Sequence, residues 1–371
     1  MKILFLCPSL DRKNGWNRYS YDVITRVAKH AEVTVLCEKK DPSIDSSIRQ
    51  IAVLRRPIDY LAHPFWVLKD ARRVRKAIAR ELDADQPNFV HCTVEGYAMF
   101  IPFLGRLRTH TLMTTHGTYS VLPLSSTLTR WLYKRVYKSV DRVISVSGYT
   151  KRHMLKHAGD IVKESKIMVV TNGVDYENKP PVPPKGDDLL RILTVGEVKN
   201  RKGGHHLVAV ANILVNKYGL KPRVTFVGNT YEERPYHKKM LQFIQDNNLQ
   251  DVVRFTGMIP QEELDEYYQE ADLFALLSVH EGSHYEGYPL VFHEAAMWGL
   301  PTVGTYDCGA EDAIKDGVSG VLVHPENHEE VAEKIAKIQS GEIDITSENC
   351  KAWAQENDWG RKNLMEMYNL S

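Results

Sequence analysis

The sequence predicts an α/β protein with two doubly wound domains, each built on a mainly parallel sheet. Short apolar runs alternate with longer amphipathic stretches along the whole chain, the pattern of strand–helix repeats. The 371 residues suffice for two domains, and the 43% apolar and 26% charged residues exclude disorder and coiled coil for the whole chain. A proline-rich stretch near the middle interrupts the alternation, so we expect one domain on each side of it.

The predicted strands are short, rich in β-branched residues and bounded by turn residues, and the longest are apolar on both faces, as buried parallel strands are. In the first half they cover residues 2–7, 32–37, 50–54, 88–92, 111–115, 142–146 and 166–171. Helices between them include 19–30, 66–82 and 128–140. Beyond the linker at 176–188, strands resume at 191–195, 224–227, 252–255, 272–277, 301–304 and 320–323. The helices of this half include 205–217, 238–247, 261–270, 290–299 and 329–340.

We therefore predict an N-terminal domain over 1–178 and a C-terminal domain over 179–354. Tandem sheets of this kind direct the carboxyl ends of their strands toward a central cleft, and ligands bind at those ends. Both domains are expected to be Rossmann-like.

The cysteines and the apolar runs indicate the compartment. The five cysteines are scattered and form no C-x-x-C pair, which favours a reducing compartment and buried thiols. The apolar start of the chain is broken by Pro8, too early for a signal peptide, and no apolar run reaches the roughly 20 residues that span a bilayer. We expect a cytoplasmic protein that is soluble or at most peripheral on the inner face of the membrane.

Two loops at predicted strand ends could bind phosphate. Asn14 and Gly15 stand between the first strand and its helix, where backbone N–H groups can cradle an anion. The absence of G-x-G-x-x-G weakens a dehydrogenase interpretation, and Gly15 could also be an ordinary turn residue. The stretch from Gly196 to Gly204 combines glycines with Lys199, Arg201 and Lys202 and reads as an anion site or as a solvated loop.

The most informative segment is 280–305, which carries Glu286 and Glu294 around a predicted helix start. Pro289 suits the first turn of that helix, which would place Glu294 on the second turn. Free N–H groups at Leu290 and Val291 would face an anion, while the carboxylates accept hydrogen bonds from hydroxyls. The alternative is that Glu286 only favours the helix dipole and Glu294 lies at the surface. Against it, the helix is mostly apolar, and a buried Glu needs partners.

The pattern from Glu286 through Glu294 to Pro301 resembles the E-x7-E signature of the retaining glycosyltransferases of family four, which have the GT-B fold. The resemblance covers nearly the whole chain. Other motifs of the family have counterparts in this chain, in the same order along the sequence. The matching residues are Gly15 with Arg18 and Tyr19; Thr115, His116 and Gly117; 143–147 and 172–175; Gly196 with Lys202 and Gly203; 308–311 and 316–320; and Trp359 with Tyr368.

The resemblance implies roles for these residues. Glu294 would bind the donor's ribose hydroxyls, Glu286 the hydroxyls of the donor sugar, and Lys202 the diphosphate, while His116 would face the reacting centre. We expect Glu286, Lys202 and His116 to be catalytic. Residues expected to bind substrate are Gly15, Arg18, Arg201, Gly257, Glu281, His284, Gly287, Tyr288, Leu290, Val291 and Glu294. The family usually needs no metal or cofactor, and its closing helix, here 355–371, packs back on the first domain.

Three positions depart from the family's pattern. Glu197 stands where the family often has a diphosphate-binding Arg, so Lys202 must supply most of the positive charge, aided by Arg201 or Lys199. Asn14 stands where the family usually has glycine. Residues 281–285 form a short insertion that repeats a Glu–Gly pair, which makes Glu281 a competitor of Glu286.

The implied function is transfer of a hexose from a nucleotide-diphosphate sugar to a lipid-linked or saccharide acceptor, with retention, in cell-surface glycan biosynthesis. Two alternatives stay open: a non-catalytic nucleotide-sugar binder, which Glu197 would favour, and another GT-B enzyme such as a sugar-nucleotide epimerase. The sequence does not specify the donor base, which is expected to be read by backbone near 257–259, nor the acceptor.

Positive charge is concentrated in the first domain, which has a net charge of +12 over residues 1–178 against −11 for the remainder. Two of its predicted helices mix basic residues with aromatic and leucine residues, as helices on anionic membranes do. The alternative is that the apolar residues face the core. Nucleic acid is not the expected partner, because no recognised binding motif accompanies the charge. The basic residues are Lys69, Arg72, Arg73, Arg75, Lys76, Arg80, Arg130, Lys134, Arg135 and Lys138.

Overall fold

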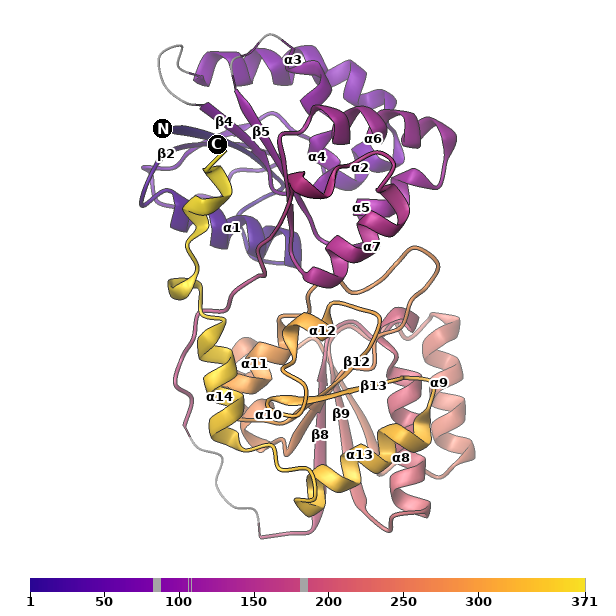
Figure 1. Cartoon of the computed structure of the whole chain (residues 1–371). Coiled ribbons are helices and arrows are strands. Elements are labelled where there is room, and N and C mark those ends of the chain that lie inside the picture. The colour runs from indigo at the N-terminus through magenta and orange to yellow at the C-terminus, as the bar shows by residue number, and fades with distance from the viewer. Residues whose placement is uncertain (83–87, 106, 108, 181–185, 371) are drawn as a thin grey trace. The chain divides into compact units, whose positions relative to one another are not determined.

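The computed structural model describes residues 1–82, 88–105, 107, 109–180 and 186–370 and divides the chain into two compact units (Figure 1). Unit 1 comprises Met1–Thr171 and Asn363–Ser371, and unit 2 comprises Asn172–Lys362. The division precedes the predicted boundary at 178, because Val174 already pairs with unit 2: its N–H donates to Asn357 at 3.1 Å and its carbonyl accepts from Trp359 at 2.9 Å. Residues 181–185 of the predicted linker lie outside the described residues.

Unit 1 is built on a parallel sheet with the strand order β3-β2-β1-β4-β5-β6-β7. Its central strand, β4, is buried at every residue, and the neighbouring β1 is buried along nearly its whole length, as its apolar sequence predicts. The strands are β1 Lys2–Cys7, β2 Glu32–Cys37, β3 Arg49–Ala52, β4 Asn88–Cys92, β5 His110–Thr115, β6 Arg142–Ser145 and β7 Ile167–Val169. The helices are α1 Gly15–Val27, α2 Pro57–Ala62, α3 Phe65–Glu81, α4 Glu95–Ala98, α5 Thr118–Val121, α6 Thr127–Ser139 and α7 Gly148–Ala158.

Unit 2 is built on a second parallel sheet, with the order β10-β9-β8-β11-β12-β13. Its strands are β8 Leu189–Val195, β9 Lys221–Val227, β10 Val253–Gly257, β11 Leu273–Ala275, β12 Thr302–Thr305 and β13 Gly320–Val323. Its helices are α8 Gly204–Asn216, α9 Pro235–Asp246, α10 Gln261–Glu270, α11 Val291–Met297, α12 Ala310–Ala313, α13 His328–Ser340 and α14 Ser347–Glu356. Both units are thus doubly wound and Rossmann-like, and every predicted strand is present, with ends that differ by at most three residues.

The strand order reverses once in each sheet, beside β1 in unit 1 and beside β8 in unit 2. Such a reversal separates the loops that follow the two neighbouring strands and leaves a crevice at their carboxyl ends, which is where ligands of these sheets bind. The relevant loops follow β1 and β4 in unit 1, and β8 and β11 in unit 2. These loops carry most of the predicted site residues.

The chain ends in unit 1, but not as the predicted helix 355–371. Helix α14 ends at Glu356 in unit 2, and the returning segment contains a 3-10 turn, Leu364–Tyr368. The guanidinium of Arg142 holds this segment by donating to the carbonyl oxygens of Glu366, Met367 and Asn369 at 2.8–3.0 Å. The resemblance predicts the return to unit 1, and the contacts of Arg142 hold the returning segment there.

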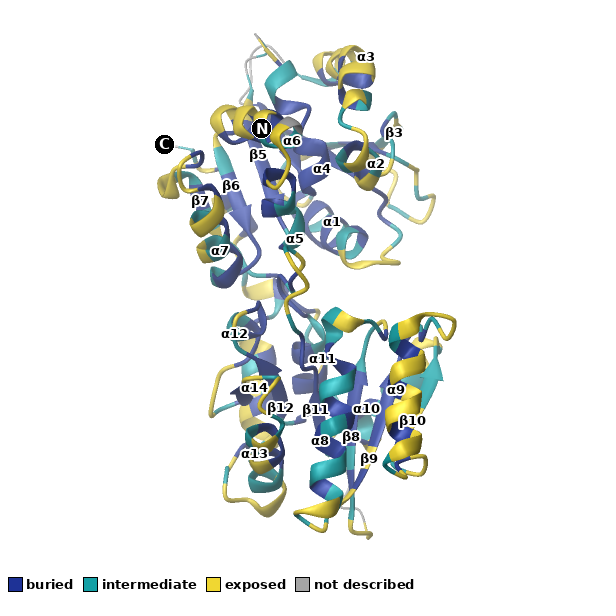
Figure 2. Ribbon diagram, turned by 90° about the vertical axis from the view of Figure 1, so that its right-hand side faces the viewer, coloured by how far each residue is buried: buried dark blue, intermediate teal, exposed yellow. Residues whose placement is uncertain are grey.

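Burial follows the layers of each unit. Figure 2 shows most of the strands in dark blue, between helices whose outer faces are yellow, while the edge strands β3 and β10 are more exposed. In unit 2, α13 packs on α8 and α11 packs on α14. Within the described part of the chain, none of the helices combines the length and the apolar character that crossing a membrane requires.

Candidate active site

The loop after β8 carries the positive charge of the site. It contains a 3-10 turn, Asn200–Lys202, followed by Gly203 in the left-handed conformation at φ 65°. A Cβ at Gly203 would lie 1.7 Å from the carbonyl oxygen of Leu277, so only glycine lets the loop approach the segment after β11. The carbonyl of Arg201 accepts a hydrogen bond from Val279 N–H at 2.9 Å, which fixes the two loops together.

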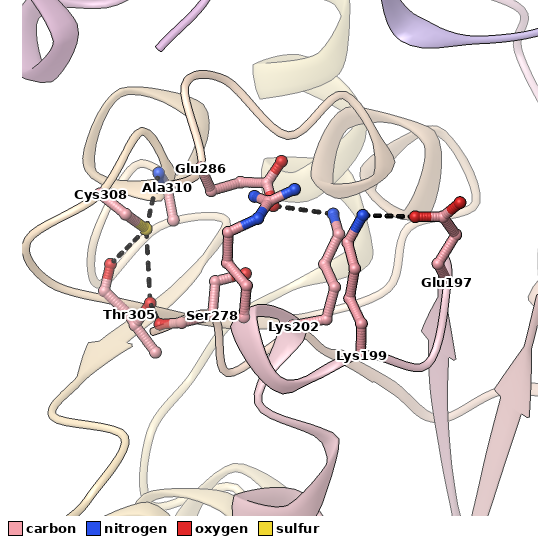
Figure 3. Close-up of polar contacts among 9 residues, drawn as sticks. Glu197, Lys199, Lys202, Ser278, Glu286, Thr305, Cys308 and Ala310 are labelled. Carbon is pink, nitrogen blue, oxygen red and sulfur yellow. Dashed lines mark hydrogen bonds and ion pairs between the residues drawn. The ribbon is translucent and has the colours of Figure 1, made fainter. Parts of the chain in front are cut away.

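Glu286 is held by two cations of this loop. Its Oε2 atom lies 2.7 Å from Nη1 of Arg201 and 2.8 Å from Nζ of Lys202, and all three side chains are less than 20% exposed. Burial raises the pKa of Glu286, but Lys202 and Arg201 outweigh it and lower the pKa to about 2. Figure 3 shows the Glu286 carboxylate directed at Lys202. The two cations are therefore positioned together in half-buried surroundings, neutralised by one carboxylate that a phosphate could replace.

Among the described residues, Glu197 forms no ion pair with Arg201 or Lys202, although the charge of Lys202 also lowers its pKa. Its side chain is 45% exposed and forms an ion pair with Lys199 (Figure 3). It also accepts a hydrogen bond from the Tyr231 hydroxyl at 2.7 Å. Burial opposes ionisation, yet Lys199 and Tyr231 lower the pKa of Glu197. Glu197, which replaces the family's Arg, thus neutralises Lys199, whereas Arg201 and Lys202 pair with Glu286.

Glu294 lies in the first turn of α11, not in the second as predicted. The helix begins at Val291 with Leu290 as its N-cap, so Pro289 precedes the helix instead of forming its first turn. The carbonyl of Leu290 accepts from the N–H of His293 and of Glu294, which sets this start. The Glu294 side chain accepts a hydrogen bond from the buried Tyr268 hydroxyl at 3.3 Å. The rest of α11 is mostly buried, as predicted.

The predicted insertion at 281–285 forms a tight turn at the surface. Glu281 and His284 exchange both backbone hydrogen bonds, at 2.9 and 3.0 Å, and both residues are exposed. Glu281 Oε1 lies 3.4 Å from the amide nitrogen of Asn200 and pairs with neither Arg201 nor Lys202 among the contacts of the described residues. Of the two competing glutamates, Glu286 is the one that the structure joins to the cationic loop.

The other predicted residues of unit 2 differ in exposure. Gly287 is buried, and a Cβ on the neighbouring Gly309 would lie 1.9 Å from the Gly287 carbonyl oxygen. The Tyr288 hydroxyl is buried and forms a hydrogen bond with Nε2 of His293 at 2.7 Å, so this side chain is bonded to α11. Gly257 ends β10, and its carbonyl accepts from Gly228 N–H at 2.9 Å. Backbone at this strand end is still available for the proposed base recognition.

In unit 1, the Asn14 side chain has a structural role that the glycine usual in the family could not fill. Asn14 is extended, at φ −146°, and its side chain caps α1 by accepting from Asn17 N–H at 3.0 Å. The cap starts α1 at Gly15, earlier than the predicted helix. No atom lies within 4 Å of a Cβ built on Gly15, so the backbone is open there, and Arg18 follows in the first turn of α1.

His116 follows β5 and is fixed in one tautomer. Its Nε2 lies 2.7 Å from the carbonyl oxygen of Thr93, which cannot donate, so Nε2 carries the proton and Nδ1 is the acceptor. The ring packs edge-on against Tyr19 with centroids 4.6 Å apart. Burial lowers the pKa of His116 to about 4, despite the hydrogen bond to Thr93 that raises it. The imidazole is therefore neutral at physiological pH and can accept a hydrogen bond from a hydroxyl.

Glu95 is a residue that the sequence analysis missed. It is fully buried, and its Oε1 accepts from the backbone N–H of His116 at 2.6 Å, while Oε2 is buried with no hydrogen-bond partner in the described part of the chain. Burial raises the pKa of Glu95 to about 7, although the His116 N–H lowers it. The available signal was a lone carboxylate between Val94 and the apolar run 97–101, directly after a buried strand.

Comparison with known proteins matches both halves of the chain to glycosyltransferase families. Residues 13–178 match the model described as Glycosyltransferase Family 4, and residues 175–357 match the model described as Glycosyl transferases group 1. This chain belongs to the GT-B glycosyltransferases of the GT4 type. The two matches overlap at residues 175–178, and together they leave only residues 1–12 and 358–371 unmatched.

The names of two relatives of this GT4-type chain refer to polysaccharide biosynthesis. The amylovoran biosynthesis glycosyltransferase AmsK of Erwinia amylovora is 32% identical over 158 residues, which are 42% of this chain and 37% of AmsK. The putative colanic acid biosynthesis glycosyltransferase WcaL of Escherichia coli K12 is 25% identical over 215 residues, 57% of this chain and 51% of WcaL. The chain thus spans about half the length of WcaL, and less of AmsK.

The fold is shared with solved glycosyltransferase structures over the full chain. HepE of Anabaena, solved with UDP and glucose, superimposes with a TM-score of 0.75 over 100% of both chains at 19% identity. At this identity the likeness concerns the fold alone. It places two Rossmann-like units in one chain, as in GT-B structures.

Proposed function

We propose that this GT4-type chain is a hexosyltransferase that uses a nucleoside-diphosphate sugar and retains the anomeric configuration. The acceptor in this proposal is lipid-linked or a saccharide, and the product belongs to a cell-surface glycan. The names of AmsK and WcaL support a role in polysaccharide biosynthesis, and the UDP and glucose bound to HepE support a nucleotide-sugar donor.

The observation that carries the proposal is the pairing of Arg201 and Lys202 on one oxygen of Glu286. The pair lies between the loops after β8 and β11, at the strand-order reversal of unit 2. A diphosphate that replaces the carboxylate would gain two charge-assisted partners whose positions the fold has already set. Glu286 would then be free to accept hydrogen bonds from the sugar hydroxyls.

Negative charge grows on the diphosphate as the glycosidic bond breaks. Cations fixed in advance stabilise that charge without reorganising, and this stabilisation lowers the barrier. Glu294, which accepts a hydrogen bond from Tyr268, is proposed to accept further hydrogen bonds from the ribose hydroxyls. The unprotonated nitrogen of His116 is proposed to accept a hydrogen bond from a hydroxyl of the donor sugar. No residue identified in the structure is assigned as a covalent nucleophile, so retention is proposed from the family resemblance alone.

The donor can be identified by thermal-shift screening of nucleoside diphosphates, because a ligand that binds the folded state raises its melting temperature. With the best nucleotide, turnover of the corresponding sugars is then measured with and without acceptor, and the anomeric configuration of the product is read by NMR. Inversion would contradict retention. Binding without turnover would identify a non-catalytic binder, and release of a new nucleotide sugar would identify an epimerase.

We further propose that unit 1 docks on an anionic membrane that carries the acceptor. Phe65 and Leu68 of α3 are 66% and 58% exposed, and Trp131 of α6 is 55% exposed, so these apolar side chains do not all face the core. Beside α3 lies an open cavity of about 460 Å³ lined by Arg72, Arg75 and Lys76 with Phe103 and two alanines. Exposed apolar residues beside cations suit a surface of acidic lipid headgroups.

Vesicle flotation tests this part of the proposal. The chain should float with vesicles containing acidic lipids, less so at high salt, since the attraction between exposed charges is screened. Replacing the basic residues at 72, 73, 75 and 76 by Gln should abolish flotation, and Phe65→Ser with Leu68→Ser should weaken it at unchanged charge. Replacing Lys238 and Lys239 of α9, in the other unit, by Gln removes two exposed charges and serves as the control. Absence of flotation at low salt would leave a soluble acceptor.

A further inference from the structure

A second pocket lies at the opposite end of the unit 2 sheet from the candidate active site. It has a volume of about 60 Å³, and three arginines line it: Arg191 on β8, Arg223 on β9 and Arg254 on β10. Arg191 is the third residue of β8, whereas Gly196 follows that strand's last residue, so the two sites are separated by about 16 Å along the strand. The pocket is therefore independent of the cations that face Glu286.

The register of the sheet brings the arginines to one face. Arg191 pairs directly with Arg223, and Arg254 pairs with Thr225, two residues further along β9 on the same face. The residues that alternate with them, such as Ile192 and Val224, belong to the core cluster that includes α8. The arginines therefore share the other face, where Tyr267, Glu270 and Ala271 at the end of α10 complete the pocket.

Like charges directly opposite each other destabilise a sheet, so an Arg–Arg pair needs compensation. Arg191 has some: it pairs with Asp187 and lies 3.7 Å from Asp272, and the charge of Glu270, which lines the same pocket, also raises the pKa of Arg191. Arg223 and Arg254 are exposed and have no carboxylate within ion-pair distance among the described residues. Two positive charges on this face are thus left without a bonded counterion.

Two hydrogen-bonding groups that belong to residues lining the pocket are also unused. Nη1 of Arg191 is buried and donates no hydrogen bond to any described residue, because its 3.7 Å approach to Asp272 is too long. Thr225 lines the pocket, and its hydroxyl has no hydrogen-bond partner in the described part of the chain. A buried guanidinium N–H without an acceptor is costly unless a ligand or solvent supplies one.

We propose that this pocket binds a phosphate dianion. A tetrahedral oxyanion presents several acceptors at once, and it can satisfy the orphan N–H of Arg191, the Thr225 hydroxyl and the guanidinium groups of Arg223 and Arg254 together. Its charge removes the repulsion between the cross-strand arginines. The small volume suits inorganic phosphate or the terminal phosphate of a small metabolite whose remainder extends into solvent.

The test measures the melting temperature of the full chain as sodium phosphate replaces sodium chloride at constant ionic strength. It is run in a Lys202→Ala background, so that phosphate bound near Glu286 contributes little. Saturating phosphate should raise the melting temperature by about 3–8 °C. Glycerol 2-phosphate forms the second arm: a shift with both ligands indicates a site that accepts phosphomonoesters, and a shift with phosphate alone indicates a site for the free ion.

The double variant Arg223→Gln/Arg254→Gln should lose the phosphate response. In chloride it should melt no lower than its parent, because the substitutions relieve repulsion. Lys238→Gln/Lys239→Gln removes the same charge from exposed positions of the same unit and should keep the full response. An equal shift in both double variants, or no shift in the parent, would overturn the proposal. So would a lower melting temperature of the arginine variant in chloride, which would make the arginines structural.

Discussion

The buried carboxyl of Glu95 makes the stability of unit 1 depend on pH. Its pKa in the folded protein is about 7, against 4.5 for an unperturbed glutamate. The folded state therefore binds the proton more tightly than the unfolded state. The stabilising contribution is complete below pH 4.5, declines as the pH rises through 7, and is absent above it. The difference corresponds to about 3 kcal/mol of unfolding free energy.

Substituting Glu95→Gln should remove this dependence. The amide oxygen can still accept from the His116 N–H, now 2.6 Å from Oε1, but the side chain no longer ionises. We expect parent and variant to be similar in stability at pH 5, and the variant to be more stable at pH 8 by up to about 3 kcal/mol. The other titratable groups near Glu95 are His116, Tyr19 and Tyr133, which stay neutral over this range because burial lowers the pKa of the histidine and raises the pKa of the tyrosines.

Denaturant unfolding at pH 5, 6, 7 and 8 measures the effect, with hydrogen exchange of the 88–116 region to assign it to unit 1. Glu164→Gln is the control: its carboxylate is 66% exposed in a surface pair with Lys151, so it should change stability by less than about 1 kcal/mol at every pH. Glu95→Ala should destabilise the unit at all pH values, because it strands the His116 N–H and leaves a cavity. A Glu95→Gln difference that is equal at pH 5 and pH 8 would refute the reasoning.

Three further predictions concern the proposed reaction. Lys202→Ala should lower kcat by at least about 10²-fold, because it removes a cation fixed beside the diphosphate. The loss should be smaller for Arg201→Ala and smallest for Lys199→Ala. If Lys199→Ala shows the largest loss, Lys199 is the residue that binds the diphosphate. Glu294→Ala should abolish turnover and weaken nucleoside-diphosphate binding in calorimetry with an unchanged melting temperature; parental binding and turnover would remove Glu294 from the site. Glu286→Gln should leave nucleoside-diphosphate affinity equal or higher, because the competing charge on Arg201 and Lys202 is gone, yet slow transfer; weaker nucleotide binding would argue against carboxylate–phosphate exchange.

Local sequence patterns were sufficient for the strands of both sheets. Buried parallel strands read as short continuous apolar runs, and this is why each predicted strand is present in the two sheets. The spacing of the E-x7-E pattern selected Glu286 over Glu281, and the structure joins Glu286 to the cationic loop. The exact helix starts were less accessible, because they depend on single hydrogen bonds such as the one from Asn17 N–H to the Asn14 side chain.

Other features depended on contacts between residues far apart in the chain. The sharing of Glu286 by Arg201 and Lys202, the engagement of Lys199 by Glu197, and the boundary at 171 all follow from which segments meet in space. The same holds for Glu95, whose raised pKa comes from its burial, and for Arg191 and Arg223, which strand register places side by side. Periodicity reports which face of an element is buried; only the assembled sheets decide which charges share that face, because electrostatic and hydrogen-bond energies depend on distances that no local pattern records.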